Sequence, residues 1–296
     1  VGSAIKQRYS NDIDHDYYFV GRQECDLLNQ ESIRKVIDKI KPDAVIHTAA
    51  RVGGIGMNLS TPANQFYENV MMNTMLIHQC AMAGVKKLIA FSSVCAFPAK
   101  IECLKEEKLH KGEPFPDHLS YAYAKRMVDV QIEAYNKQYG LNYCSVIPGN
   151  IFGKRDNFNL KHGHVIPALI HRCYLAKQAN IPFEVWGNGE PMREFIYSED
   201  VARVCVQLIQ KEKLPQRIIV SGEREYKIKE IVSIICKNFD YYNVRWLKDK
   251  PNGQMKRPSD KSIFNQFMKD FKYSDINETL SETINWFEKS YPEVRK

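Results

Sequence analysis

Tyr121 and Lys125 form the residue pair whose types and spacing most directly suggest chemistry. They stand four positions apart in the segment SYAYAK, so on a helix both side chains project from the same face. A nearby ammonium group lowers the pKa of a phenol, which can then exchange a proton with a substrate oxygen near neutral pH. Because the chain has 16 tyrosines, this spacing also arises by chance, and the pair needs support from its surroundings.

Reactive side chains also follow the apolar run in AFSSVCAFP, residues 90–98. Ser92 and Ser93 end the run, and Cys95 stands two places beyond Ser93. Ser93 can hydrogen-bond the same substrate oxygen as Tyr121 if the fold brings the two together. Without any chemistry, the segment would be a strand end that turns into a loop.

Short β-branched runs alternate with longer helical patterns over the first two-thirds of the chain. They predict strands at 17–21, 43–50 and 86–93, a strand and loop at 142–153, and helices at 29–41, 69–84 and 124–140. This alternation is typical of an α/β fold with a Rossmann-like, doubly wound parallel sheet. Ligands bind beyond the carboxyl ends of the strands in such sheets. The stretches that follow three of these ends should therefore border one crevice, namely 47–50, 92–95 and 148–150.

Composition narrows the class of protein. The 296 residues are 44% hydrophobic and 26% charged, as in ordinary soluble proteins. We expect no membrane partner, because no apolar run approaches the ~20 residues that cross a bilayer and no signal segment opens the sequence.

The net charge of +7 comes from scattered Lys and Arg residues, which favours a polyanionic small molecule over nucleic acid as a binding partner. Eight cysteines without a CxxC pair suggest no metal site and fit reduced thiols in a cytoplasmic protein.

The opening segment VGSAIKQRY resembles the last glycine of a GxxGxxG loop and the helix that follows it. The N-terminus of that helix would hold a pyrophosphate, with Gly2 beside it. The sequence begins after the strand and the first two glycines of such a motif.

Taken together, Ser93, Tyr121 and Lys125 resemble the Ser-Tyr-Lys set of the extended short-chain dehydrogenase/reductases. Five segments resemble the GDP-L-fucose synthase family in particular, in the right order and over essentially the whole chain: HTAARVGGIGMN, SSVCAFP, SYAYAKRM, GHVIPALIHR and VWGNGEPMREFIYSEDVA. The resemblance implies 3,5-epimerisation of GDP-4-keto-6-deoxy-D-mannose, followed by NADPH-dependent reduction at C4 to GDP-L-fucose.

In that family, the positions of Cys95 and His164 supply the acid and the base for epimerisation. LKHGHVIP holds two histidines, and either could instead be an idle loop residue. Sugar-nucleotide 4,6-dehydratases, which resemble this fold, carry an Asp-Glu pair where this chain has Val94 and Cys95. The absence of those carboxylates argues against dehydration.

The resemblance also implies the residues that bind NADP(H): Gly2, Arg22, Ala49, Ala50, Ser92, Ser93, Tyr121, Lys125, Pro148, Asn150, Ile151 and His164. Arg22 matches the position where NADP-preferring members hold the 2′-phosphate, although Glu24 and Asp26 stand nearby. Otherwise Arg22 would be a solvated turn residue.

Family positions for the nucleotide sugar are Asn150, Arg172, Trp186, Arg193, Asn252 and Arg257. Arginines suit a diphosphate and a tryptophan can pack on a base or sugar, although a lone Trp is more often a core residue. Three departures from the family pattern are Gly149, which would loosen its loop, Asn252 in place of an acid and Arg257 in place of a lysine. They leave open a UDP- or dTDP-linked keto sugar as substrate.

A non-catalytic nucleotide-sensing protein of the same fold is a further alternative, motivated by the incomplete phosphate loop. The predicted organisation is an NADP-binding domain at 1–165 and a mainly nucleotide-sugar-binding α/β domain at 166–296, with some segments returning to the first. The family implies a homodimer paired through the helix that carries Tyr121 and its neighbour. The apolar faces of 69–84 and 124–140 fit that pairing and fit core packing equally well.

Overall fold

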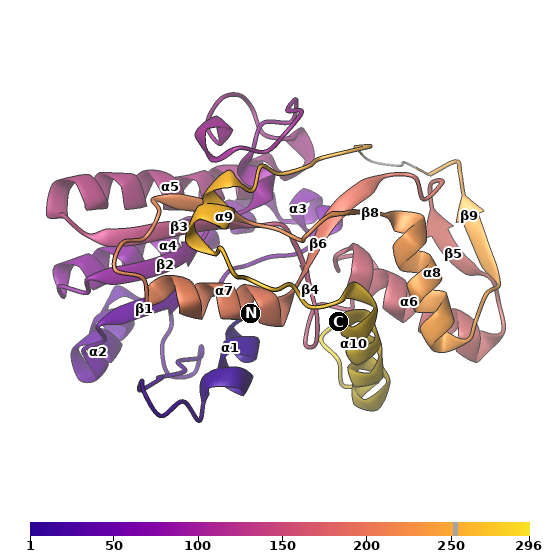
Figure 1. The fold of residues 1–296 in the computed structure, drawn as a ribbon, viewed down its shortest axis with the longest axis horizontal. Helices are drawn as coiled ribbons and strands as arrows, with labels where there is room; N and C mark the ends of the chain where they lie inside the picture. The colour runs from indigo at the N-terminus through magenta and orange to yellow at the C-terminus, as the bar shows by residue number, and fades with distance from the viewer. Residues whose placement is uncertain (251–253) are drawn as a thin grey trace.

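The computed structural model describes residues 1–250 and 254–296. Four parallel strands make the largest sheet, in the order β1 (Ala44–His47), β2 (Lys87–Phe91), β3 (Asn142–Pro148) and β7 (Arg217–Val220). The two central strands are almost wholly buried, as expected for a parallel sheet covered on both faces. The predicted α/β fold with a parallel sheet is confirmed (Figure 1).

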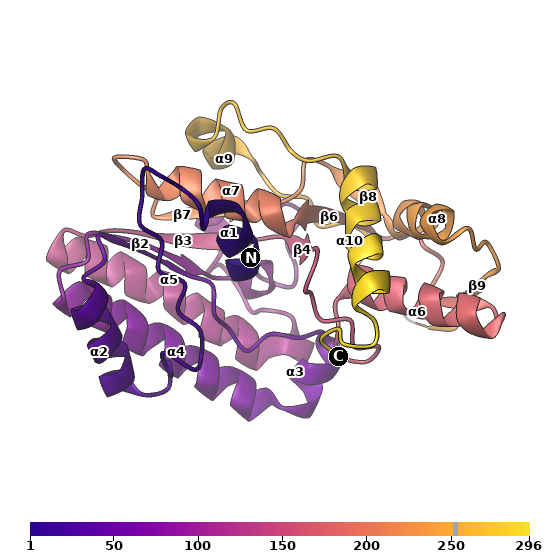
Figure 2. The same ribbon diagram turned by 90° about the horizontal axis from the view of Figure 1, so that it is seen from below.

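Helices cover both faces of this sheet (Figure 2). One face packs against α2 (Gln30–Ile40), α4 (Pro62–Met82) and α5 (Leu119–Tyr139). The other face packs against α1 (Gly2–Tyr9), α7 (Ser198–Ile209) and α9 (Ser262–Phe267).

Two helices begin earlier than their apolar periodicity indicates. Helix α4 opens at Pro62, where the missing N–H of proline costs nothing, and its first turns are mostly polar. Helix α5 opens at Leu119, directly after the 3₁₀ turn η3 (Pro116–His118). Its end at Gly140 agrees with the prediction, and the left-handed backbone of this C-cap favours glycine.

The strand predicted at 17–21 is wrong, since no strand is assigned there. A strand requires a hydrogen-bonded neighbour, and within residues 1–250 and 254–296 β1 pairs with β2 alone. The aromatic side chains stack instead in a row, with ring centroids 5.7 Å apart for Tyr9–Tyr17 and 6.0 Å apart for Tyr17–Phe19.

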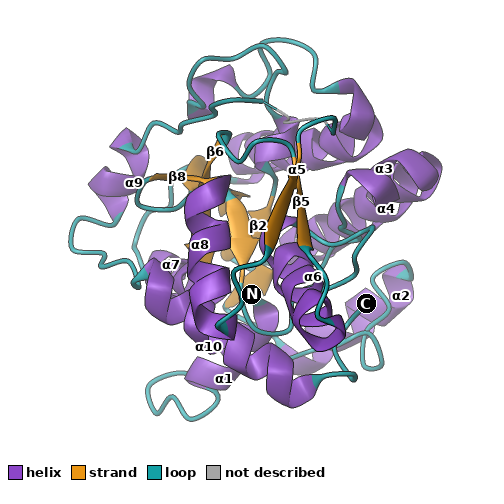
Figure 3. Ribbon diagram, turned by 90° about the vertical axis from the view of Figure 1, so that its right-hand side faces the viewer, coloured by secondary structure: helices purple, strands orange, loops and turns teal. Residues whose placement is uncertain are grey.

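A second group of elements surrounds a separate aromatic and aliphatic core at the other end of the molecule (Figure 1), the end that faces the viewer in Figure 3. Its helices are α6 (Val165–Ala179), α8 (Ile228–Phe239) and α10 (Ile276–Ser290). Its strands are β5 (Phe183–Trp186) paired with β9 (Val244–Leu247), and β6 (Met192–Tyr197) between β4 (Asn150–Phe152) and β8 (Glu225–Lys227).

The short elements that remain are α3 (Ile55–Ser60), η1 (Val94–Ala96) and η2 (Glu106–Lys108). Helix α7 and strand β7 follow residue 165 in the sequence but pack on the large sheet. A division into cofactor-binding and substrate-binding domains at residue 165 stays a prediction. None of the helices in the described part of the chain is long and apolar enough to cross a membrane.

Candidate active site

The turn that carries Ser93 and Cys95 begins where β2 ends. The Ser92 amide still donates to the Val146 carbonyl of β3 at 2.8 Å, after which the chain leaves the sheet as η1. The Ser92 hydroxyl donates to the carbonyl of Lys125 on α5 at 3.0 Å. The end of β2 is therefore joined directly to the helix that carries Tyr121 and Lys125.

Four of the predicted catalytic residues meet at this point. The Ser93 Oγ accepts a hydrogen bond from the Cys95 amide at 3.1 Å and also hydrogen-bonds Tyr121. The Lys125 Nζ lies 5.9 Å from the centre of the Tyr121 ring and donates to the Phe91 carbonyl at 2.9 Å. Ser93, Cys95, Tyr121 and Lys125 thus form one cluster.

Burial controls the ionisation of this cluster. It raises the pKa of Tyr121 well above its usual value, a negative charge at Cys95 would raise it further, and the Ser93 hydrogen bond opposes the rise. Burial also lowers the pKa of Lys125 to about 8. The sequence suggested that Lys125 would lower the pKa of Tyr121, but Lys125 is not among the groups that shift it, and its ammonium group is bonded to the Phe91 carbonyl. Tyr121 therefore holds its proton at neutral pH, as a proton donor must.

His47 and Asn73 are buried neighbours of the cluster that the sequence did not single out. The His47 Nε2 hydrogen-bonds the Asn73 Oδ1 at 2.8 Å. Burial, followed by the charge of Lys125, lowers the pKa of His47 to about 4, and the bond to Asn73 opposes this shift. His47 is therefore neutral and adds no second positive charge beside Lys125.

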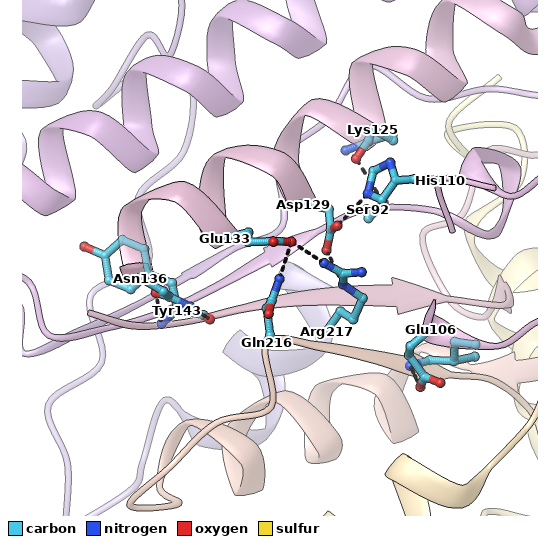
Figure 4. A network of polar contacts seen from close by, with 11 residues as sticks. Ser92, Glu106, His110, Lys125, Asp129, Glu133, Asn136, Tyr143, Gln216 and Arg217 are labelled. Carbon is cyan, nitrogen blue, oxygen red and sulfur yellow. Dashed lines mark hydrogen bonds and ion pairs between the residues drawn. The ribbon is translucent and has the colours of Figure 1, made fainter. Parts of the chain in front are cut away.

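A polar network fixes the position of α5 (Figure 4). Asp129 lies one helical turn after Lys125 and is fully buried. Its carboxylate is 2.7 Å from the His110 Nε2 and 3.0 Å from the Arg217 Nε of β7. Arg217 also contacts the exposed Glu133 at 2.7 Å. These contacts hold α5, with Tyr121 and Lys125, against the sheet.

Side chains from distant parts of the chain bind three consecutive carbonyls of η1. The Arg257 Nη2 donates to the Val94 carbonyl at 3.1 Å, and the imidazole of His118 hydrogen-bonds the Cys95 backbone. The Arg126 Nε donates to the Ala96 carbonyl at 2.7 Å. The sequence analysis missed His118 and Arg126. The signal for them was their closeness in sequence to the predicted pair, since His118 stands three residues before Tyr121, in η3, and Arg126 directly follows Lys125 on α5.

His164 lies at the start of α6, and its side chain is 45% exposed. The His164 Nδ1 is 4.0 Å from Asp156, a carboxylate whose pKa is raised by burial and lowered in part by His164. Among the described residues, no hydrogen bond or ion pair joins His164 to the Ser93–Cys95–Tyr121–Lys125 cluster.

The loop before His164 packs against the glycine-rich segment after β1. The Gly54 amide donates to the His162 carbonyl at 2.7 Å, and a Cβ on Gly54 would lie only 2.7 Å from the Gly163 carbonyl oxygen. The backbones can approach this closely because position 54 is glycine. The segment VGGIG thereby fixes the loop that leads to His164.

The predicted cofactor positions border the ends of β1 and β3. A Cβ on Gly2 would lie 2.8 Å from the Thr48 Oγ1, so the first turn of α1 lies directly against the end of β1. Ala49 is exposed and Ala50 half-buried just beyond that end. Arg22 is exposed in the turn after residue 21.

At the end of β3, Pro148 is buried, while Asn150 is exposed and Ile151 half-buried. The Asn150 Nδ2 donates to the Glu194 carbonyl at 2.9 Å. The Gly149 amide donates to the Val220 carbonyl at 2.9 Å, and a Cβ at Gly149 would lie 3.1 Å from the Ser221 Cβ. These contacts hold the loop in place.

The predicted substrate residues fall into two groups. Arg193 and Arg257 are half-buried neighbours, and after burial the charge of Arg257 is the next cause that lowers the pKa of Arg193. Neither makes an ion pair within residues 1–250 and 254–296. In the second group, the Arg172 guanidinium lies 5.3 Å from the ring centre of the exposed Trp186. Asn252 lies outside the described residues.

A Ser-Tyr-Lys cluster at the strand ends of a parallel sheet, beside two arginines that make no ion pair among the described residues, is typical of a short-chain dehydrogenase/reductase of the nucleotide-sugar type. The model of the NAD dependent epimerase/dehydratase family matches residues 1–222.

Three relatives narrow the family further. The chain is 37% identical to a GDP-L-fucose synthase of Dictyostelium discoideum, with 100% of this chain and 94% of the relative covered. It is 32% identical to a GDP-L-fucose synthase of Escherichia coli, with 97% of this chain and 93% of the relative covered. A solved GDP-L-fucose synthetase of Naegleria fowleri, bound to NADP, superimposes with a TM-score of 0.92 at 35% identity, covering 100% of this chain and 91% of that one. The chain belongs to the GDP-L-fucose synthase family.

Proposed function

We propose that the protein converts GDP-4-keto-6-deoxy-D-mannose into GDP-L-fucose by 3,5-epimerisation and NADPH-dependent reduction at C4. The cluster of Ser93, Cys95, Tyr121 and Lys125 at one strand end carries this proposal. Relatives of similar length that share this fold are GDP-L-fucose synthases. They favour a GDP-linked sugar over UDP- or dTDP-linked sugars, and a set of reactive side chains argues against a non-catalytic sensor.

Epimerisation begins with the 4-keto group, which acidifies the C–H bonds at C3 and C5. A base removes one of these protons, and the electron pair of the C–H bond moves onto the keto oxygen to give an enolate. Ser93 and the protonated Tyr121 are proposed to stabilise that oxygen. A proton returned to the opposite face inverts the carbon, and Cys95 and His164 are the proposed base and acid.

Reduction follows at C4, where bound NADPH supplies the hydride. Tyr121 donates its proton to the C4 oxygen, and Ser93 holds that oxygen in place. Lys125 would hold the ribose hydroxyls with the ammonium hydrogens that it does not donate to Phe91. The close approach of Gly2 to Thr48 fits a pyrophosphate lying at the N-terminus of α1. Arg22 is the proposed partner of the 2′-phosphate, and Ala49, Ala50, Pro148 and Ile151 are proposed to line the nicotinamide side.

The diphosphate of the substrate fits the arginine pair. Buried guanidinium groups without a carboxylate partner are costly unless an anion neutralises them. Arg193 and Arg257 are half-buried and make no ion pair among the described residues, so part of this cost applies to them. Arg172 with the exposed Trp186 offers a further charge and a flat apolar surface. We assign these four residues, together with Asn150 and Asn252, to the nucleotide sugar.

A homodimer and a cytoplasmic location are part of the same proposal. Helices α4 and α5 pack side by side and expose large apolar side chains, among them Tyr67 (61% exposed) and Val130 (47% exposed). Pairing of two such faces would bury these side chains. Sedimentation or light scattering would test the dimer, and Val130→Glu should favour the monomer.

NADPH oxidation with GDP-4-keto-6-deoxy-D-mannose, followed by identification of the sugar product, tests the function directly. Oxidation that yields GDP-L-fucose supports the proposal. If NADPH binds but the GDP sugar is not turned over, the proposal is wrong and other nucleotide sugars become the candidates.

A further inference from the structure

Glu194 is a buried carboxylate that no step of the proposed reaction uses. It directly follows Arg193 on β6 and is 7% exposed. Its Oε2 accepts a hydrogen bond from the Ser259 hydroxyl at 2.5 Å, and its Oε1 lies 3.7 Å from the Lys261 Nζ. Both partners belong to one stretch of chain, residues 254–261, which we call the crossing segment. Because a buried carboxylate is costly without such partners, the burial of Glu194 requires the crossing segment in this position.

The crossing segment is attached to β6 near both of its ends. Near its start, the Met192 amide donates to the Met255 carbonyl at 2.8 Å. Near its other end, the carboxylate of Glu194 binds Ser259. Arg257 lies between these two attachments, so the position of its guanidinium depends on both of them.

Ser259 also joins the crossing segment to the large sheet. Its hydroxyl lies 2.6 Å from the hydroxyl of Ser221, which follows β7 and is 3% exposed. Since the Ser259 hydroxyl gives its one hydrogen to the carboxylate, Ser221 is the donor between the two serines. The Leu104 amide donates to the Pro258 carbonyl, and the Asp260 amide donates to the Leu104 carbonyl, both at 2.8 Å. The contact with the carboxylate therefore brings together β6, the end of β7 and the loop after η1.

The backbone of Glu194 holds a further residue that we assign to the nucleotide sugar. Its carbonyl accepts a hydrogen bond from the Asn150 Nδ2 at 2.9 Å. Arg193 precedes it on the strand, and Arg257 stands two residues before Ser259. One strand position thus connects three residues of the proposed substrate site.

We propose that Glu194 is a positioning residue for the nucleotide sugar. Its carboxylate fixes the crossing segment on β6 and thereby holds Arg257 where the substrate diphosphate binds. It acts through these neighbours and not by contact with the sugar. This inference rests on the proposed function, which assigns Arg193 and Arg257 to the diphosphate.

The test compares the full-length wild type with Glu194→Gln, Ser259→Ala and the control Glu190→Gln. Glutamine at position 194 keeps the size of the side chain but removes the charge that faces the crossing segment, and alanine at position 259 removes the hydroxyl. Glu190 stands four residues before Glu194 and pairs with Lys227 and Lys229 at 2.7 and 2.6 Å, outside the crossing segment. The control therefore removes a carboxylate that the crossing segment does not need.

Two measurements are made without sugar substrate. Hydrogen exchange of the peptides that contain Leu104 and Asp260, followed by mass spectrometry, reports whether the crossing segment stays attached. Titration calorimetry gives the Kd of GDP and of NADP⁺. We expect Glu194→Gln and Ser259→Ala to speed the exchange and to raise the Kd of GDP about tenfold, because loss of a hydrogen bond to a charged group shifts the attachment by about that factor and the apparent Kd follows the attached fraction. The Kd of NADP⁺ should not change, and Glu190→Gln should alter neither measurement.

Unchanged exchange in both variants would overturn the inference, and so would faster exchange with an unchanged Kd of GDP. An equal loss of NADP⁺ affinity, or an equal effect of Glu190→Gln, would also overturn it, because a general loss of structure would then explain the result. If Glu194→Gln does not fold, Ser259→Ala still decides.

The same titrations separate this inference from the proposed function. If the wild type binds UDP or dTDP in place of GDP, and the two variants weaken that binding, the proposed substrate is wrong while the positioning role of Glu194 stands. If the wild type binds no nucleoside diphosphate, both are refuted.

Discussion

Replacing Lys125 with methionine should stabilise the folded protein at neutral pH while it removes a proposed catalytic group. Lys125 is 1% exposed, and burial lowers its pKa from 10.5 to about 8. At about 1.36 kcal/mol for each pKa unit, this difference corresponds to roughly 3 kcal/mol of unfavourable charge burial at pH 7. The substitution also removes the hydrogen bond to the Phe91 carbonyl, which costs about 1 kcal/mol. We therefore expect a net gain of about 2 kcal/mol.

Lys125 also makes the stability of the wild-type protein depend on pH. The folded state releases the Lys125 proton near pH 8, whereas the unfolded chain keeps it up to about pH 10.5. Between these values the unfolded state binds more protons, so the contribution of Lys125 to the free energy of unfolding rises with pH. Below pH 8 both states are protonated and the full burial penalty remains.

Urea denaturation of the wild type and of Lys125→Met, at several pH values from about 7 to about 10.5, tests this reasoning. Buried thiols and phenols also titrate in that range, but they are common to both proteins. The difference in unfolding free energy, wild type minus variant, should rise by about 3 kcal/mol across the range. Lys137→Met, at an exposed position on the same helix, should give a difference that does not change with pH. A pH-independent difference for Lys125→Met would refute the argument.

Three further outcomes are expected. Tyr121→Phe should lower the rate of NADPH oxidation at least about 100-fold with NADPH binding intact, because the proton donor is lost; near-normal oxidation would remove Tyr121 from its role. Cys95→Ser should impair solvent-deuterium incorporation at C3 and C5 but spare reduction of a keto sugar already in the final configuration, whereas equal loss of both would contradict this division of labour. Asp129→Asn should lower the unfolding free energy in urea by about 3 kcal/mol, since it removes the fully buried carboxylate that holds both Arg217 and His110. Glu133→Gln removes an exposed contact of the same arginine and should cost below about 1 kcal/mol.

Local patterns predicted the elements of the fold well. The apolar spacing of Ile33, Val36, Ile37 and Ile40 predicted a helix at 29–41, and the structure has one at Gln30–Ile40. The residues at 17–21 have strand-like composition, but a strand also requires a partner, which periodicity cannot show. The early start of α4 was missed because its first turns carry polar residues without an apolar stripe.

The candidate site was predicted only in part. The strand ends that carry Ser93 and Cys95 could be placed from the rule that parallel strands present their carboxyl ends at one edge. The ionisation state of Tyr121 could not be predicted from the sequence, because it is set by burial, and burial depends on the packing of the whole molecule. His118 and Arg126 act on backbone carbonyls far away in the sequence, and such contacts leave no motif.

The contacts of residues 254–257 join Arg193, a proposed diphosphate ligand, to the turn that carries Ser93 and Cys95. The Arg193 Nη1 donates to the Gln254 carbonyl at 2.6 Å, and the Gln254 Nε2 donates to the Ala99 carbonyl at 2.9 Å. Arg257, from the same short segment, donates to the Val94 carbonyl. A diphosphate that draws Arg193 or Arg257 toward itself must therefore alter a hydrogen bond to the segment or to the turn. Substitutions in residues 254–257 should therefore change substrate affinity and the reactivity of Cys95 together. If substrate binding and catalysis belonged to separate units of the structure, only one of the two properties would change.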